Sequence, residues 1–331
     1  MGINIISTGS FTSNEILDNI QLSEMVDTSE EWIIERTGIK TRHIASDFTT
    51  EDLAANACDN AIKNANLNKD DIQLIIVASV TSDTVVPSSS FLVSEKLDIK
   101  NCTCFDINVA CSGFIYSITV AKALMASLNI KYAAVIGAEK LSKVVDWGDR
   151  ASCVLFGDGA GCVILENTDI TNTAKNSKFN CQLEIVANTI GGNFDYKKYL
   201  TIARKDKIDD QVNPFIKMNG RQIYKFATEI GIEVIDELLK KSNINKDELA
   251  LIVPHQANSR IVDTLAEKSG IDKKKWFINI DKYGNTSSAS VPIAMDEALD
   301  SFDFESNRGK YIISLAFGGG LSFGGILVKI I

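Results

Sequence analysis

Apolar and polar positions along the chain follow two alternating periods. Helix-like segments, with apolar positions three and four residues apart, cover residues 52–64 and 222–241. Each is followed by a short apolar run rich in β-branched residues, Ile72 to Val77 and Leu249 to Val253, which predicts a buried strand. A further helix-like run, Ile115 to Leu128, follows a strand-like stretch that ends near residue 109. This alternation predicts an α/β fold with mixed sheets.

The chain also repeats itself. Asn66 to Val77 and Asn243 to Pro254 align without a gap over twelve residues, and each follows an amphipathic helix and enters a strand. Later in each half, Phe156 to Gly161 and Phe317 to Gly325 place glycine turns before apolar runs, as in a hairpin. Two pairs of similar segments, which occur in the same order in each half, predict an internal duplication. We therefore expect one half over residues 1–170 and a second over residues 171–331.

Two polar segments interrupt this pattern. Asn167 to Lys178 is rich in Asn, Thr, Asp and Lys and predicts a surface linker between the halves. Gly191 to Asn213 is irregular and polar, and a long insertion of this kind is more often functional than incidental.

Composition narrows the class of protein. The 331 residues are 45% hydrophobic and 23% charged, as in ordinary globular proteins. A net charge of −9 without a sequence-wide basic surface argues against nucleic acid as a partner. The chain lacks a signal-peptide pattern and an apolar stretch of the roughly 20 residues that a membrane helix needs. Seven cysteines without a C-x-x-C pair indicate free thiols in a reducing cytoplasm, and two histidines cannot complete a usual zinc site.

Cys111 is the first candidate for chemistry. It lies where a strand-like run passes into the helix-like run Ile115 to Leu128, so we expect it at a helix N-terminus. The positive end of the helix dipole favours thiolate, the reactive form of cysteine, and exposed backbone N–H groups can hold an oxyanion there. The alternative is a small buried apolar residue, which most cytosolic cysteines are.

Two residues of the second half extend this candidate site. His255 directly follows the predicted strand Leu249 to Val253, at the sheet edge that ligand sites in α/β proteins prefer. Asn285 precedes the helix-like segment Ile293 to Leu299, the place that Cys111 takes in the first half. Each has a structural alternative, a satisfied core or loop histidine and a helix-capping asparagine.

Together these side chains are suited to acyl transfer. A thiolate can attack an acyl thioester, and a neutral histidine and an amide can donate hydrogen bonds to an enolate oxygen. Histidine could equally deprotonate the cysteine, as in a hydrolase, and the residues alone do not decide between these chemistries. The run Gly318 to Gly320 offers close backbone approach and further N–H donors, although it is also a suitable strand turn.

The chain resembles the 3-oxoacyl-(acyl-carrier-protein) synthase III family of the thiolase superfamily. The matching segments spread over nearly its whole length and are Thr28 to Ile39, the segment around Cys111, Phe156 to Gly161, Pro254 to Asn258, Gly284 to Pro292, and Phe317 to Gly320. The Cys-His-Asn combination separates this family from condensing enzymes that use two histidines.

The resemblance implies a thiolase-like, five-layered α-β-α-β-α fold with two mixed sheets, and a cytoplasmic homodimer without cofactor or metal. It implies that Cys111 takes an acyl group from acyl-CoA, while the amides of Cys111 and Gly319 form an oxyanion hole. His255 and Asn285 would then promote decarboxylation of malonyl-acyl carrier protein, and the carbanion would attack the acyl-enzyme to begin fatty acid synthesis.

The resemblance also assigns binding residues. Those expected to contact CoA are Trp32, Arg36, Arg150 and Asn258, and the indole and guanidinium groups suit adenine and phosphate. Those expected to dock the acidic carrier protein are Lys225, Arg260 and Lys268, and those expected at the acyl pocket are Val86 and Phe317.

Two departures from the family pattern leave the substrates open. Residues 166–217 are longer and more polar than expected, and Val86 is small where some members carry a large aromatic. An acyltransferase of secondary metabolism or surface-sugar biosynthesis, with a non-malonyl acceptor, is therefore the alternative. A non-catalytic dimeric scaffold is a third hypothesis.

Overall fold

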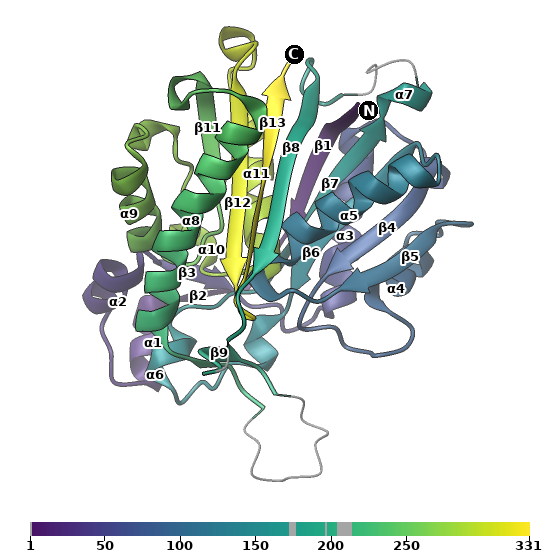
Figure 1. Ribbon diagram of the computed structural model, residues 1–331. Helices are drawn as coiled ribbons and strands as arrows, with labels where there is room; N and C mark the ends of the chain where they lie inside the picture. The colour runs from purple at the N-terminus through teal and green to yellow at the C-terminus, as the bar shows by residue number, and fades with distance from the viewer. Residues whose placement is uncertain (1, 172–176, 196, 204–213) are drawn as a thin grey trace.

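The structure is a computed structural model that describes residues 2–171, 177–195, 197–203 and 214–331. Its described strands form one large mixed sheet in the order β11-β12-β13-β8-β1-β7-β6-β4-β5, with two small hairpin-like pairs beside it (Figure 1). The strands of the first half are β1 (Ile3–Phe11), β4 (Ile72–Ala78), β5 (Thr103–Ile107), β6 (Tyr132–Glu139) and β7 (Gly159–Asn167). Those of the second half are β8 (Leu183–Gly192), β11 (Leu249–Pro254), β12 (Tyr311–Gly318) and β13 (Ser322–Ile330).

Helices cover both faces of this sheet. The longer ones are α3 (Thr50–Asn64), α4 (Ser89–Lys96), α5 (Gly113–Ser127), α8 (Gly220–Ser242), α9 (Ser259–Ser269) and α11 (Ser290–Asp300). The shorter elements are α1 (Asn19–Met25), α2 (Glu30–Thr37), α6 (Arg150–Cys153), α7 (Thr168–Thr171), α10 (Ile280–Tyr283), and the strands β2 (Ile16–Asp18), β3 (Thr41–His43), β9 (Leu200–Thr201) and β10 (Lys217–Met218).

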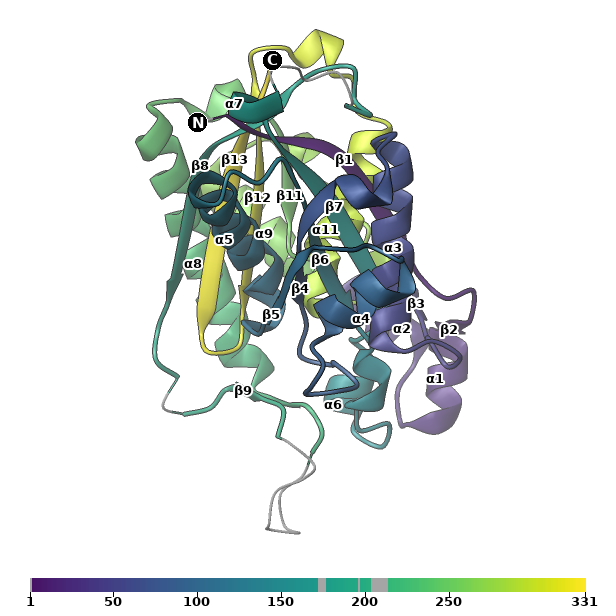
Figure 2. The same ribbon diagram turned by 90° about the vertical axis from the view of Figure 1, so that its right-hand side faces the viewer.

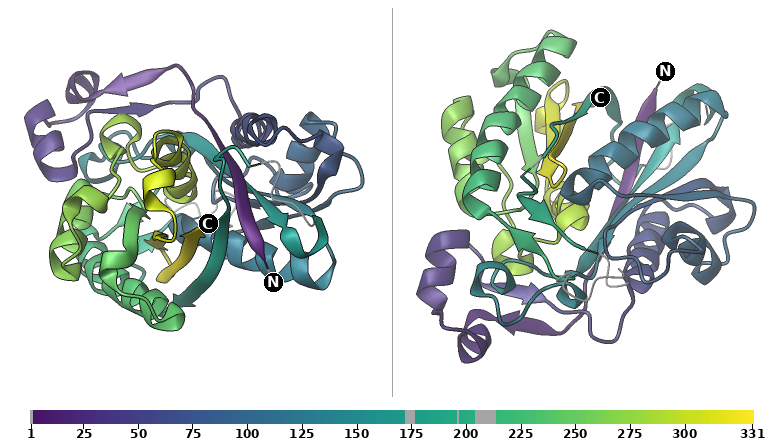
Figure 3. Two further views of the ribbon diagram at one scale, coloured as in Figure 1. Left: turned by 90° about the horizontal axis from the view of Figure 1, so that it is seen from above. Right: turned by 60° about the horizontal axis from the view of Figure 1, so that its bottom comes forward.

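The elements pack in five layers (Figures 2 and 3). Helices α5 and α11 lie in the centre, because each contacts strands of both halves of the sheet. On one outer side α3 and α4 cover β1, β6 and β5, and on the other α8 covers β8, β12 and β13 with α9 packed on it. Three of the apolar clusters of buried side chains fill the spaces between these layers. The predicted α/β class and five-layered arrangement are confirmed.

The predicted duplication is visible in the backbone. Asn66 and Asn243, the first residues of the two aligned stretches, both adopt a left-handed φ of 52°. In each copy a 3-10 turn follows, closed by a capping box between Asn68 and Asp71 or between Asn245 and Glu248, and then the strand β4 or β11. The repeat therefore fixes the same helix–turn–strand connection twice.

The strands of the two halves are joined by one short pairing. Strands β1 and β8 pair through only two residue pairs, Asn4 with Glu184 and Ile5 with Leu183. This short contact joins the two expected sheets into one continuous nine-stranded sheet of the described residues. The sequence predicts that residues 166–217 are unusually polar and long. The described part of this segment contains β8, which is a strand of the main sheet. Part of that segment, residues 172–176, 196 and 204–213, lies outside the described residues.

Residues 110–127 form the one stretch of the described chain that is apolar and long enough to cross a membrane. Helix α5 occupies most of it and contacts β6, β4 and β8 in the central layer. That position is typical of the core helix of a folded domain, which passes the same test of length and composition.

Candidate active site

Cys111 lies in the predicted strand-to-helix turn, within a 3-10 segment over Ala110–Ser112 that leads into α5. It is 7% exposed and lines a cavity of about 830 Å³. The pKa of its thiol is raised to about 11, mainly by burial and in smaller part by the charge of Glu139, while the Ser287 hydroxyl opposes this shift. The thiolate expected at this helix N-terminus stays a prediction, because desolvation of the buried thiol opposes the effect of the helix dipole.

The end of β12 presses against Cys111. A Cβ atom on Gly318 would lie 2.8 Å from the backbone nitrogen and 3.0 Å from the Cβ of Cys111, so only glycine fits there without a shift. The next residue, Gly319, lines the cavity together with Cys111. The glycine run thus brings a segment of the second half into contact with the turn of the first.

His255 follows β11, as predicted, and its ring is buried. Its backbone N–H donates to Leu315 O at 2.8 Å, and its Nδ1 lies 2.5 Å from the Ser290 hydroxyl. Burial lowers the pKa of His255 to about 3, so the imidazole is neutral near pH 7. Gln256 N donates to the same hydroxyl at 3.4 Å. A serine that accepts from this amide can direct its own hydrogen at Nδ1, which favours the tautomer with hydrogen at Nε2.

The backbone of Asn285 is hydrogen-bonded to the first half of the chain. Its backbone N–H donates to Leu155 O at 2.8 Å, and its carbonyl accepts from Gly157 N at 3.2 Å. Its side-chain Oδ1 accepts from Ser287 N at 2.9 Å. Because this bond occupies the oxygen, the Nδ2 end of the amide is the end that can donate to a ligand.

These three side chains converge on one short turn, Ser287–Ser290. The Ser287 hydroxyl contacts the Cys111 thiol, Ser287 N holds Asn285, and the Ser290 hydroxyl holds His255. The turn starts at Ser287 with a positive φ of 51°, as the Cys111 turn starts at Ala110 with a φ of 45°. By this backbone match Ser288 corresponds to Cys111, so the predicted equivalence of Asn285 and Cys111 is wrong by three residues.

Apolar side chains form part of the cavity lining. They include Val80, Leu141, Val144, Phe156, Leu200, Ile202 and Ile216. Neither residue predicted for the acyl pocket is among the lining residues of this single chain. Val86 is 85% exposed, and Phe317 is buried with its ring edge-on to His255 at a centroid distance of 5.5 Å. Phe317 therefore packs the histidine, and Phe156 and Val85 line the cavity instead.

The residues predicted to bind CoA fall into two contacting pairs. The Arg150 guanidinium lies over the Trp32 ring at 4.7 Å and donates to Asp27 O at 2.8 Å. Asn258 caps α9 by accepting from Arg260 N at 2.9 Å, and its Nδ2 donates to Arg36 O at 3.0 Å. A planar ring inserted between Trp32 and Arg150 would need about 7 Å, twice the ~3.5 Å stacking distance. The slot between them is closed in this structure.

The three residues predicted to dock a carrier protein lie on neighbouring helices. Lys225 is exposed on α8, and Arg260 and Lys268 are exposed on α9, which packs on α8. They therefore share one outer side of the molecule.

Sequence reasoning missed three polar side chains of this site: Glu139, Ser287 and Ser290. The two serines belong to a serine-rich turn that the sequence displays, but their roles depend on contacts across the fold. Within the described residues, no group of three or more His, Cys, Asp or Glu side chains could hold a metal ion.

Comparisons with known proteins agree over the length of the chain. Two family models match, one described as 3-oxoacyl-[acyl-carrier-protein (ACP)] synthase III over residues 105–201 and one as its C-terminal part over residues 239–330. A curated beta-ketoacyl-[acyl-carrier-protein] synthase III of Clostridium perfringens (strain SM101 / Type A) is 42% identical over 327 residues, 98% of each chain. The crystal structure of 3-oxoacyl-[acyl-carrier-protein] synthase III from Aquifex aeolicus VF5 matches with a TM-score of 0.88 and 41% identity, covering 99% of this chain and 100% of that one. A priming beta-ketosynthase from the R1128 polyketide biosynthetic pathway matches with a TM-score of 0.88 and 27% identity, over 99% and 96% of the two chains.

Proposed function

Since the chain belongs to the 3-oxoacyl-(acyl-carrier-protein) synthase III family, we propose that Cys111, His255 and Asn285 carry out its decarboxylative condensation. The chain is an acyltransferase of the condensing type, a beta-ketoacyl-acyl-carrier-protein synthase III that initiates fatty acid synthesis. The observation that carries the residue assignment is the convergence of the three side chains on the Ser287–Ser290 turn.

In the first half-reaction Cys111 attacks the carbonyl carbon of an acyl-CoA. A bond forms between its sulfur and that carbon, and the bond to the CoA sulfur breaks. The thiol proton is transferred to the departing CoA thiolate, which leaves as the CoA thiol, so the proton count balances. His255 is not the base in this step, because its Nδ1 is engaged by Ser290 and its Nε2 carries the hydrogen. The amides of Cys111 and Gly319 hold the oxyanion, which the close packing of Gly318 on Cys111 supports.

In the second half-reaction a malonyl thioester on the carrier protein loses carbon dioxide. The electron pair of the broken bond becomes an enolate, whose oxygen accepts from His255 Nε2–H and Asn285 Nδ2–H. The enolate carbon then attacks the acyl-Cys111 carbonyl, which forms the 3-oxoacyl product and releases the sulfur. A neutral imidazole with its hydrogen at Nε2 suits this task, and the buried contact with Ser290 supports that state.

The substrates are proposed to approach from the side of α2, α6, α8 and α9. Trp32, Arg36, Arg150 and Asn258 would hold the CoA nucleotide, with adenine entering the slot between indole and guanidinium. Lys225, Arg260 and Lys268 would offer a local basic patch to the acidic carrier protein, since this chain as a whole is negative. No cofactor or metal is needed for these steps.

We also propose a homodimer in the cytoplasm, with the duplicated halves dividing near residue 170. Strand β5 is an edge strand of the large sheet. Helix α4 packs on β5, and exposed apolar side chains lie on this helix and just before it: Phe91, Val85 and Val86. A second copy of the chain would cover them. The seven cysteines are all free thiols, as in a reducing compartment.

Acyl loading tests this function directly. The purified protein is incubated with a panel of acyl-CoAs, and intact-protein mass spectrometry measures the mass gain. We expect one acyl group per chain, absent from Cys111→Ser, whose smaller nucleophile keeps the fold but not the transfer. Absence of any adduct on the native protein would contradict the proposal.

Carbon dioxide release separates condensation from the alternative acceptor. Loaded protein mixed with malonyl-carrier protein should release one carbon dioxide per acyl group consumed. His255→Ala and Asn285→Ala should reduce this step more than loading, because both donors act on the enolate. Equal damage to both half-reactions would refute that division, and transfer to an amine or hydroxyl without carbon dioxide would favour the alternative.

A further inference from the structure

Glu139, the last residue of β6, carries a fully buried carboxyl group that the proposed reaction does not use. A buried carboxylate is costly unless neighbouring donors satisfy it, so its retention beside a reactive thiol requires an explanation. Burial raises the pKa of Glu139, and four donor groups oppose that shift.

All of its described donors are neutral. Thr81 Oγ1 donates at 2.6 Å, Ser288 Oγ at 2.8 Å, and Val80 N at 3.2 Å to one oxygen and 3.3 Å to the other. Ser79 Oγ lies farther away at 3.4 Å. These bonds can hold an ionised carboxylate, but they leave its charge without an ion-pair partner.

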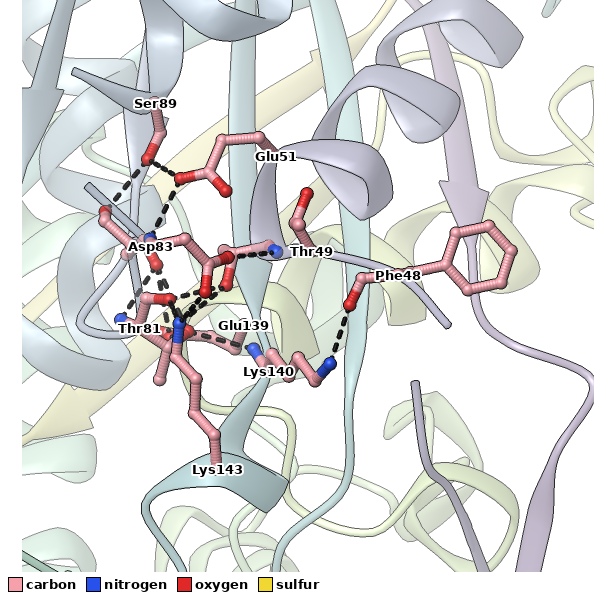
Figure 4. A network of polar contacts seen from close by, with 12 residues as sticks. Phe48, Thr49, Glu51, Thr81, Asp83, Ser89, Glu139, Lys140 and Lys143 are labelled. Carbon is pink, nitrogen blue, oxygen red and sulfur yellow. Dashed lines mark hydrogen bonds and ion pairs between the residues drawn. The ribbon is translucent and has the colours of Figure 1, made fainter. Parts of the chain in front are cut away.

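The neighbouring lysines bind elsewhere, as Figure 4 shows. Lys140 Nζ donates to Phe48 O at 2.8 Å, while its backbone N–H donates to Thr81 Oγ1 at 2.9 Å. Lys143 Nζ bonds to Thr81 O and pairs with Asp83 at 2.8 Å. Glu51 in turn binds Asp83 N and Ser89 Oγ. This network fixes the Ser79–Asp83 wall of the cavity, and its cations face Asp83 and main-chain oxygens.

On its other side Glu139 reaches the catalytic turn. Its bond to Ser288 anchors the residue whose backbone position matches that of Cys111 in the first half. The adjacent Ser287 holds Asn285 through its N–H, and its hydroxyl contacts both the Cys111 thiol and Glu139. One carboxylate therefore connects the cavity wall of the first half with the turn of the second, next to the nucleophile.

We propose that Glu139 is a positioning residue with two effects: it fixes the Ser287–Ser288 turn that carries Asn285, and its negative charge adds to the effect of burial in keeping Cys111 in the thiol form while the site is empty. A thiol resists the oxidants and electrophiles that attack a thiolate, so the nucleophile would be protected until acyl-CoA arrives. The positioning effect rests on the proposed function, whereas the charge effect concerns Cys111 alone.

The charge effect is tested by alkylation of Cys111 with iodoacetamide as a function of pH, which needs no substrate. Peptide mass spectrometry follows the Cys111 peptide, and Cys111→Ala reports alkylation of the other six cysteines. The titratable groups that can influence the ionisation of the Cys111 thiol are Glu139 from β6 and His255 from the end of β11. Asp83, Lys140 and Lys143 lie farther along the network. His255 is neutral throughout the range used.

Glu139→Gln should lower the midpoint of the alkylation profile by at least about one pH unit, because a nearby like charge disfavours ionisation by that order. Glu139→Asp, which withdraws the charge by one methylene, should fall between the native protein and Glu139→Gln. A loosened site would also ease ionisation, because burial is the main cause of the raised pKa of Cys111. Ser288→Ala, which loosens the turn and keeps the charge of Glu139, is therefore the control and should retain the native midpoint. If Glu139→Gln fails to fold, Glu139→Asp decides the question, and a native midpoint in the folded variant would overturn the charge effect.

Ser288→Ala tests the positioning effect, since it removes the bond to the turn and keeps the charge. Its alkylation midpoint should stay native, while condensation by the preloaded acyl-enzyme should fall at least tenfold. Native condensation in this variant would overturn the positioning effect. Failure of the proposed function itself would differ, because then the native protein would not accept an acyl group.

Discussion

Gly318 and Cys111 are packed so closely that a methyl group on Gly318 would lie 2.8 Å from the Cys111 backbone nitrogen. This nitrogen is one of the two proposed donors of the oxyanion hole. The contact joins the end of β12 to the turn before α5, so each half of the duplicated chain sets the position of the other.

Gly318→Ala should therefore slow acyl loading of Cys111 by at least about tenfold. The added carbon must displace backbone atoms and cannot be accommodated by a flexible side chain, and a misplaced oxyanion donor typically costs 10²–10³ in rate. Stopped-time mass spectrometry of acyl-enzyme formation measures this rate.

Gly220→Ala is the matched control, because a Cβ there meets only Met218 Cε at 3.9 Å. It should load at the native rate. A Gly318→Ala protein that also loads at the native rate would show that the β12 end does not fix the donor.

His255 should give the protein a measurable pH dependence of stability. Its pKa is about 3 when folded and about 6.5 when unfolded. Between these values the unfolded chain binds more protons, so the free energy of unfolding falls as the pH falls below about 6.5. From pH 7 to pH 5.5 this one residue should cost the native protein about 1 kcal/mol, measured by urea unfolding.

His255→Asn removes the titrating group and serves as the comparison. The difference in unfolding free energy between native protein and variant should shift by that amount over the same pH interval. A difference that stays constant with pH would mean that the folded histidine titrates normally.

The repeat and the three reactive residue types could be predicted because they depend on local sequence. Asn66 and Asn243 adopt the same left-handed conformation, and the aligned strands occupy equivalent places in the two halves. The positions of Cys111 and His255 at element ends follow from the same local patterns.

The charge state of the nucleophile could not be predicted in this way. The helix N-terminus is a local feature visible in the sequence, whereas the burial of Cys111 and the approach of Glu139 from β6 arise from packing between distant segments. Likewise, the glycine-rich turns at Phe156 and Phe317 look alike in sequence. Phe156 lines the cavity, whereas Phe317 packs on His255. The reason is that Phe317 lies on β12, which pairs with β11, the strand that His255 follows.

Arg42 should be among the side chains most important for stability. It is fully buried and donates to Leu17 O at 3.1 Å and to Asn19 Oδ1 and Val154 O at 3.0 Å. Arg42→Met removes a donor from three oxygens, two of them in buried hydrogen bonds, and should lower the unfolding free energy by about 3 kcal/mol or more. Urea unfolding of the variant measures this loss.

Arg308→Met is the control for the loss of a guanidinium. Arg308 is exposed and pairs with Glu305 three residues away, so its removal should cost no more than about 0.5 kcal/mol. Equal effects of the two substitutions would mean that the three acceptors of Arg42 find other donors.

Arg150 and Trp32 should determine the affinity for the nucleotide part of acyl-CoA. The two side chains stack at 4.7 Å, so adenine must displace the guanidinium before it can lie between them. Arg150→Ala removes one face of the slot and should raise the KM for acyl-CoA roughly 2- to 5-fold, with kcat little changed, because a cation–π contact contributes about 0.5–1 kcal/mol. Acyl-pantetheine, which lacks the nucleotide, should show the same KM with the native protein and the variant. Lys225→Ala, a substitution of an exposed cation on α8, is the control and should leave the KM and kcat of acyl loading at their native values. If Arg150→Ala raised the KM for acyl-pantetheine as much as for acyl-CoA, the side chain would act on the shared part of the substrate, and the adenine slot would lie elsewhere.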